Sequence, residues 1–142
     1  ARAVFGEKDW QQLAVIRAMA AREVSGLNIV GHGTVREADG LAMSSRNALL
    51  PPQDRRRATA MVRALVEAGR HSGVAAAEES GRRLLLANRL VPEYVAVRDG
   101  ETLGPVRTGK PARVLAAARC GGVRLIDNAP WPGFSLGTVR TA

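Results

Sequence analysis

The stretch "EKDWQQLAVIRAMAAREVSGLNIV", residues 7–30, decides the fold class that this sequence predicts. Apolar side chains recur in it at steps of three and four residues, which predicts a helix from Glu7 to Val24 with Gly26 as its stop. The apolar run 27–30 then predicts a short buried strand. A helix followed by a buried strand is half of a β–α–β unit, so the fold class is predicted to be α/β.

The parallel sheet of such a unit needs more strands than the first part of this chain provides. The 142 residues suit one compact domain or two small lobes. Because the chain starts at Ala1 and not at a methionine, we expect it to be the middle of a longer protein. Residues 1–48 are therefore predicted to be the C-terminal part of a larger α/β domain.

A boundary is expected at the proline pair 51–52, because prolines can open a helix but not lie inside one. The apolar stripe after the prolines predicts a helix that ends at Gly69, and a second helix is expected at about 74–88. Gly81 weakens the second helix by about 1 kcal/mol relative to alanine, unless another element packs closely there.

The remaining sequence is rich in strand-forming residues. Strands are expected at 93–99, 113–119 and 123–128, with a hairpin link "CGG" between the last two. The tail 129–142 has no periodicity and is expected to be extended or mobile. Residues 49–142 are therefore predicted to form a small α+β lobe of two helices and about three antiparallel strands.

The composition, 46% hydrophobic and 24% charged, is typical of a folded protein. No apolar run approaches the roughly 20 residues that span a bilayer, and no signal peptide is recognised, so a membrane protein is not expected. Cys120 is the only cysteine, and His32 and His71 are far apart. We therefore predict no internal disulfide, no metal site and a reducing, cytoplasmic location.

The formal net charge of +8 comes almost entirely from arginine. Such a charge can serve an anionic substrate or a nucleic acid. Apart from 55–57 the arginines are scattered, and aromatic residues make up only 4% of the chain. A nucleic-acid partner is therefore not expected, and a surface that simply favours arginine explains most of the charge.

The segment "FGEKDWQQL", residues 5–13, is the first candidate site. Gly6 precedes a helix start, where free N–H groups and the helix dipole favour an anion. That dipole disfavours Lys8 by about half a kcal/mol, so its position suggests an external anion. Lys8, Asp9 and Gln12 lie within one turn and can reach one ligand. The alternative is an ordinary amphipathic helix with a charged first turn.

The segment "READGLAMSSRN", residues 36–47, is the second candidate site. Ser44 and Ser45 offer hydroxyl and backbone donors, and Arg46 offers a planar guanidinium that matches phosphate oxygens. Gly40 leaves room for close backbone approach. Taken alone, such a loop is more often a turn or a helix cap.

The segment "VRLIDN", residues 123–128, ends in Asp127 and Asn128. Both residue types are common turn formers. We interpret them in this way and assign them no chemistry.

Taken in order, three motifs resemble the pantoate–β-alanine ligase (pantothenate synthetase) family: "FGEKDWQQLAVIRAM" at 5–19, "TVREADGLAMSSRN" at 34–47 and "RLIDN" at 124–128. The resemblance covers nearly the whole chain and corresponds to the C-terminal half of the family. It implies the nucleotidyltransferase superfamily, in which an HxGH motif and a KMSKS-like loop grip ATP; "AMSSR" resembles that loop. The implied fold is the end of a Rossmann-like domain followed by an α+β lobe.

The resemblance also implies roles for the residues that match the motifs. Gln12 would hydrogen-bond pantoate, and the catalytic set would be Lys8, Ser44, Ser45 and Arg46. The implied ATP contacts are Gly6 and Asp9 at the ribose, Lys8 at the phosphates, Val35 and Met43 at adenine through their main chains, and Ser44, Ser45 and Arg46 at the triphosphate.

The implied reaction uses ATP with Mg²⁺ to join pantoate and β-alanine through pantoyl adenylate, and it releases pantothenate, AMP and pyrophosphate. It needs no protein nucleophile, so Cys120 need not take part. The family implies a homodimer for the full-length enzyme. Because the HxGH half is absent, we expect the isolated chain to be inactive or nearly so.

This sequence departs from the family at Gly33, where proline is usual, and at His32 before it. Both differences concern the backbone beside Val35 and therefore the implied adenine contact. Two alternatives remain: another adenylate-forming nucleotidyltransferase, against which "EKDWQQL" argues, and a non-catalytic basic module that binds nucleotides or nucleic acid.

Overall fold

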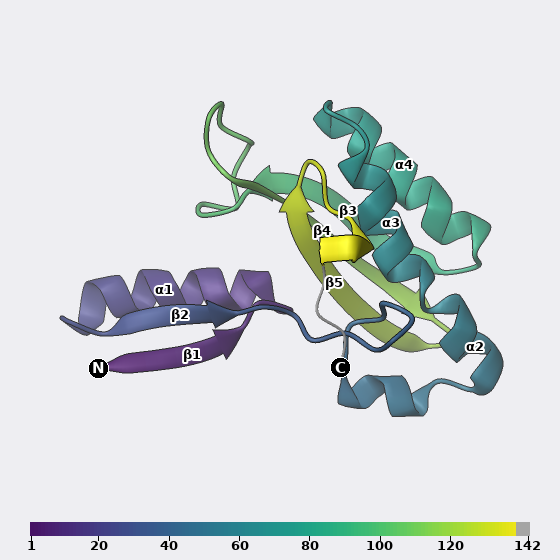
Figure 1. The fold of residues 1–142 in the computed structure, drawn as a ribbon, viewed down its shortest axis with the longest axis horizontal. Coiled ribbons are helices and arrows are strands. Elements are labelled where there is room, and N and C mark those ends of the chain that lie inside the picture. Colours follow the sequence, from purple (N-terminus) through teal and green to yellow (C-terminus); the bar gives the residue numbers. More distant parts are fainter. Residues whose placement is uncertain (139–142) are drawn as a thin grey trace.

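The computed structural model describes residues 1–138, which fold into two units (Figure 1). The N-terminal unit, residues 1–32, consists of β1 (Arg2–Gly6), α1 (Trp10–Glu23) and β2 (Asn28–His32). A loop with the 3-10 helix η1 (Ser45–Leu49) connects it to the C-terminal lobe, residues 50–138. The lobe consists of α2 (Pro52–Arg57), α3 (Ala60–Gly69), α4 (Val74–Ala87), β3 (Val91–Asp99), β4 (Ala112–Cys120), β5 (Val123–Trp131) and the 3-10 helix η2 (Leu136–Thr138).

The N-terminal unit is a complete β–α–β unit and not half of one. β1 and β2 pair in parallel, from Arg2 opposite Asn28 to Gly6 opposite His32, and α1 is the crossover between them. The prediction of an α/β element is confirmed, but β1 was not expected, and β2 ends at His32, two residues beyond the predicted strand 27–30. α1 begins three residues later than expected, because the Asp9 side chain caps its first turn.

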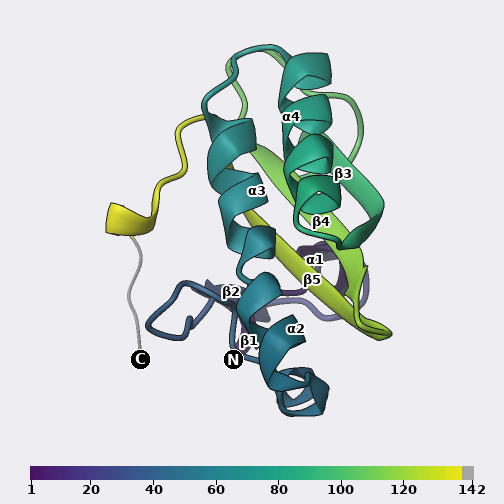
Figure 2. The same ribbon diagram turned by 90° about the vertical axis from the view of Figure 1, so that its right-hand side faces the viewer.

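The C-terminal lobe is a three-stranded antiparallel sheet in the order β3–β4–β5, with α3 and α4 on one face (Figure 2). The prediction of an α+β lobe is confirmed, with the short α2 as an additional helix that starts at Pro52. β4 and β5 pair up to Cys120 opposite Val123, so the hairpin loop is the two-residue Gly121–Gly122. Both glycines have positive φ, which suits a tight hairpin turn.

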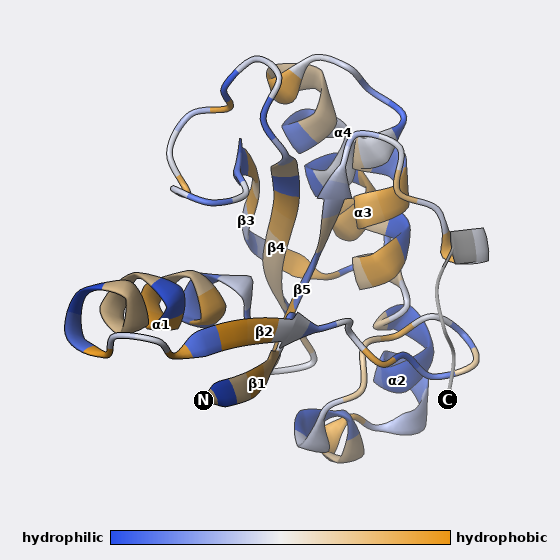
Figure 3. Ribbon diagram, turned by 60° about the vertical axis from the view of Figure 1, so that its left-hand side comes forward, coloured by the Kyte–Doolittle hydropathy of each residue, from blue (hydrophilic) through white to orange (hydrophobic). Residues whose placement is uncertain are grey.

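Apolar residues of α3 and β4 form the centre of the lobe's core, as the hydropathy colouring of Figure 3 illustrates. Met61, Leu65 and Val114 are at most 1% exposed. Gly81 of α4 belongs to this packing: a Cβ there would lie 3.0 Å from Val95 Cγ1 and 3.3 Å from the Ala64 carbonyl oxygen. Another element therefore packs closely against Gly81, which is the condition under which a glycine was expected to suit this helix.

The segment after residue 128 is ordered by the sheet. β5 continues to Trp131, which pairs with Ala112, is largely buried and donates from Nε1 to the Ala68 carbonyl at 3.0 Å. Residues 129–131 are therefore extended, which agrees with one of the two expected states of the tail, but they are part of a strand that was expected to end at 128. Residues 139–142 lie outside the described part of the chain. No helix among the described residues has the length and apolar character needed to cross a membrane.

Candidate functional site

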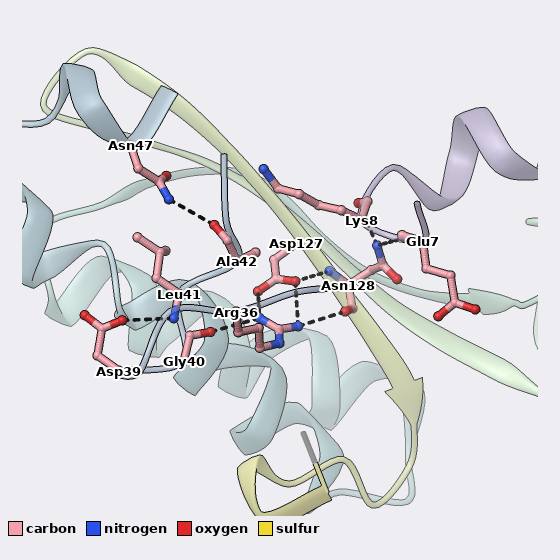
Figure 4. Close-up of polar contacts among 10 residues, drawn as sticks. All are labelled: Glu7, Lys8, Arg36, Asp39, Gly40, Leu41, Ala42, Asn47, Asp127 and Asn128. Atoms are coloured by element: carbon pink, nitrogen blue, oxygen red, sulfur yellow. Dashed lines mark hydrogen bonds and ion pairs between the residues drawn. The ribbon is translucent and has the colours of Figure 1, made fainter. Parts of the chain in front are cut away.

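Two segments that are far apart in the sequence meet at the middle of β5 (Figure 4). One is the turn between β1 and α1, which carries Glu7 and Lys8. The Nδ2 group of Asn128 donates hydrogen bonds to the carbonyl oxygens of Glu7, at 2.9 Å, and Lys8, at 2.8 Å. The lobe therefore holds the backbone that presents the Lys8 side chain.

The other segment is residues 36–40, the "READG" loop, which a buried ion pair fixes to β5. Arg36 donates from Nη1 to Asp127 Oδ2 at 2.6 Å and from Nη2 to Asp127 Oδ1 at 2.9 Å. Both side chains are at most 3% exposed. The Arg36 Nη1 group also donates to the Gly40 carbonyl, and the Asn128 N–H donates to Asp127. Losing one member of such a pair leaves a buried charge unpaired, which costs about 3–5 kcal/mol.

The interpretation of Asp127 and Asn128 as turn formers is wrong. They lie inside β5, opposite Ala116 and Leu115 of β4. A proline at position 130 argues against a strand that continues past residue 128. β5 nevertheless includes Pro130, because it is an edge strand, where proline is tolerated. An acid and an amide in the middle of a largely apolar strand need polar partners, and this was the available signal for a role.

Lys8 and Arg46 are the predicted site residues that the structure brings together. Lys8 is half-buried, and Arg46 is exposed, with one long hydrogen bond of 3.4 Å to the Arg124 carbonyl. Within residues 1–138 neither side chain forms an ion pair. Burial lowers the pKa of Lys8, Asp127 opposes this effect and the charge of Arg46 adds to it. Two neighbouring cations that lack an ion-pair partner can hold an anion.

The loop that carries Ser44 and Ser45 is held by hydrogen bonds between its own residues. Asn47 Nδ2 donates to the Ala42 carbonyl at 3.0 Å, and the Ser44 Oγ atom accepts from the Arg46 N–H at 3.2 Å as the cap of η1. The helix-cap alternative is therefore realised for Ser44. Ser45 is the exposed first residue of η1.

The other predicted contacts lie on the same two segments. Asp9 accepts from the backbone N–H of Gln12 at 3.2 Å, and the Gln12 side chain is exposed. The Met43 N–H donates to the Val35 carbonyl at 2.9 Å, and both side chains are 43% exposed. Beside Gly6, no atom lies within 4 Å of where a Cβ would be, so a ligand can approach this backbone.

Gly33, where the sequence departs from the family's proline, has equally open surroundings. Its carbonyl oxygen lies 3.0 Å from Nδ1 of the exposed His32. Among the described residues there is no group of three or more histidine, cysteine or acidic side chains that could hold a metal ion.

A separate cleft of about 750 Å³ lies between α1 and the end of the β3–β4 hairpin. One wall is Trp10, whose ring stacks under Arg113 at 3.6 Å and whose Nε1 donates to the Gly100 carbonyl. None of the residues predicted to contact ATP or pantoate lines this cleft. This cleft is therefore distinct from the predicted ATP and pantoate contacts.

The model of the pantoate–β-alanine ligase family matches residues 1–130. The pantothenate synthetase of Anaeromyxobacter dehalogenans is 52% identical over 137 residues, which cover 92% of this chain and 47% of that protein. The pantothenate synthetase of Rubrobacter xylanophilus is 50% identical over 141 residues, 92% of this chain and 48% of that protein. The chain thus spans about half the length of these curated relatives.

Solved structures give the same result. The pantothenate synthetase of Thermus thermophilus superposes with a TM-score of 0.84 at 41% identity, over 92% of this chain and 50% of that one. The pantoate–β-alanine ligase of Francisella tularensis, solved with beta-gamma ATP and β-alanine, has the same fold, with a TM-score of 0.63 at 24% identity over 91% of this chain and 43% of that one. The chain therefore belongs to the pantoate–β-alanine ligase family, of which it is the C-terminal part.

Proposed function

We propose that the full-length protein containing this chain condenses pantoate with β-alanine at the expense of ATP. In the first step a carboxylate oxygen of pantoate bonds to the α-phosphorus of ATP, and pyrophosphate leaves. In the second step the amine nitrogen of β-alanine attacks the acyl carbon of pantoyl adenylate. AMP leaves, the nitrogen gives up a proton, and the product is pantothenate.

The observation that carries this proposal is the pair of cations Lys8 and Arg46. They come from segments almost forty residues apart, the charge of Arg46 acts on Lys8, and neither side chain forms an ion pair among the described residues. Negative charge builds on the phosphate oxygens in the first step, and fixed cations beside those oxygens lower the barrier. The second step depends on holding the acyl adenylate beside the amine and away from water.

The neighbouring residues have groups left for a ligand. Ser44 Oγ accepts from the Arg46 N–H, and its own O–H stays available to donate to a phosphate oxygen. Asp9 uses Oδ1 as the helix cap, and its second oxygen can accept from a ribose hydroxyl. We assign Ser45 to the phosphates as well, Gly6 to the ribose and Gln12 to pantoate.

Adenine is assigned to the hydrogen-bonded backbone pair of Val35 and Met43. The ATP and β-alanine complex of the Francisella relative supports these two substrates for the family. We treat Mg²⁺ as part of the ATP substrate, since Mg²⁺ commonly binds through the phosphates and keeps several waters.

In this proposal residues 1–48 complete an ATP-binding domain, and residues 49–142 form the lobe that closes on it. The HxGH motif and most of the pantoate and β-alanine pocket belong to the half that precedes them in the family. The isolated chain is therefore inactive or nearly so. The active enzyme is a homodimer in the cytoplasm.

The test is pantoate-dependent exchange of pyrophosphate into ATP by the full-length protein. Lys8→Ala and Arg46→Ala should each reduce the exchange rate by about tenfold or more, because each removes a cation that faces the phosphates. Arg83→Ala is the control: Arg83 is an exposed arginine of α4 that pairs with Glu79, and exchange should be unchanged.

Exchange at the wild-type rate in both site variants would show that these residues are not the phosphate ligands. Exchange that requires another carboxylic acid would identify a different adenylate-forming enzyme. Salt-sensitive duplex binding without exchange would favour a nucleic-acid module.

A further inference from the structure

We propose that Asp127 and Asn128, two consecutive residues of β5, are positioning residues that set the place and the charge of Lys8. They make the C-terminal lobe a working part of the phosphate site, although neither side chain touches ATP. This inference rests on the proposed function.

Asn128 sets the place of Lys8. Its Nδ2 group bonds the Glu7 and Lys8 carbonyls, and its Oδ1 atom accepts from Arg113 Nε at 2.8 Å. An arginine can only donate, so this contact fixes which end of the amide faces the turn. Both bonded carbonyls lie between the end of β1 and the start of α1, where the backbone belongs to no helix or strand. Asn128 therefore defines the turn from which the Lys8 side chain leaves.

Asp127 sets the charge of Lys8. Three N–H donors, two from Arg36 and one from the Asn128 backbone, bond its buried oxygens, and this arrangement needs an ionised carboxylate. Burial raises the pKa of Asp127, and the bonds from Arg36 oppose this rise. The buried carboxylate of Asp127 therefore carries a negative charge, which raises the pKa of the half-buried Lys8.

Four charged side chains from four segments of the chain act on Lys8. Asp127 acts from β5, Arg46 from η1, Arg36 from the "READG" loop and Asp9 from the same turn. Burial and the two arginines lower the pKa of Lys8, whereas the two carboxylates raise it, Asp127 more than Asp9. Without the charge of Asp127, Lys8 loses its proton at a lower pH. Because only the protonated amine attracts phosphate, activity must then fail earlier as the pH rises.

The experiment measures pyrophosphate exchange by the full-length enzyme between pH 6 and pH 10. Asp127→Asn should move the alkaline limb to lower pH, so that the ratio of rates at pH 9 and pH 7 falls by about threefold or more. Asn128→Ala should raise the KM for ATP by roughly tenfold at every pH, because it displaces the cation and leaves the charges in place.

The control is Asp99→Asn. Asp99 is also buried and also accepts two bonds from an arginine, Arg107, at 2.7 and 3.1 Å, but it lies at the end of β3 and does not act on Lys8. This variant should lose stability and keep the wild-type alkaline limb. If Asp127→Asn does not fold, the double variant Arg36→Met/Asp127→Leu replaces the buried pair with apolar groups. It should shift the limb in the same direction, since Asp127 acts on Lys8 more strongly than Arg36.

A folded Asp127 variant with the wild-type pH profile would overturn the inference. So would an equal shift in Asp99→Asn, because the shift would then report general destabilisation. A wild-type enzyme without pantoate-dependent exchange would refute the proposed function itself and is recognised before any variant is measured.

Discussion

The two units of this chain differ sharply in how they bury apolar side chains. α3 of the C-terminal lobe buries seven of its ten residues, whereas α1 of the N-terminal unit, with fourteen residues, buries only Leu13 and Ala20. Val4, Val15 and Met19 of the N-terminal unit are between 56% and 60% exposed. Parallel sheets in proteins are normally covered on both faces. The lobe thus contains its own core, whereas the β–α–β unit leaves much of its apolar surface exposed.

The largest expected effect of this difference is on stability. Leu65→Ala in α3 removes a side chain that is 0% exposed and should lower the free energy of unfolding by about 2–5 kcal/mol, measured by urea denaturation. The matched variant Val15→Ala in α1 should change it by less than about 0.5 kcal/mol. Equal losses in the two variants would break the comparison.

An intermediate effect is expected in hydrogen exchange of the 142-residue chain. Backbone amides of β4, central in the lobe's sheet, should exchange at least about tenfold more slowly than those of β1 and β2, because an uncovered pair of strands opens more easily. Mass spectrometry of peptides from the two units measures this ratio. In the full-length protein the ratio should shrink, and equal protection in the isolated chain would contradict the interpretation.

The smallest effect tests how tightly the lobe is packed. Gly81→Ala should destabilise the chain by about 1 kcal/mol or more, because the new methyl group meets Val95 and the Ala64 carbonyl. Helix propensity alone predicts the opposite sign. Ala76→Gly, at an exposed position of the same helix, should also destabilise, by about 0.5–1 kcal/mol. If Gly81→Ala melts at a higher temperature than the wild type, then α4 can shift enough to accommodate the methyl group, and the lobe is packed less tightly than we infer.

The parts of the fold that follow from local pattern could be predicted. The apolar periodicities of α3 and α4, the proline at the start of α2 and the double glycine of the hairpin each indicated the right element. β1 was missed because "RAVFG" is too short to show a pattern. Its pairing with β2, more than twenty residues away, cannot be recognised from the local sequence.

The candidate site shows the same division. Lys8 and Arg46 could be singled out by residue type and by the family's motifs, but their proximity is a property of the tertiary structure. Asp127 was missed because its partner, Arg36, is 91 residues away. Ser44 admitted two interpretations, and only the tertiary structure shows that it caps η1.

The dipeptide Asp127–Asn128 at the middle of β5 constrains the length of the Gly121–Gly122 hairpin loop. Successive strand residues point to opposite sides, which is how Asp127 bonds the "READG" loop while its neighbour Asn128 reaches the turn after β1. An insertion or deletion of one residue at the Gly121–Gly122 turn would exchange these two sides of β5. Both contacts would be lost together, so the length of the hairpin loop decides whether β5 can hold the "READG" loop and the turn after β1.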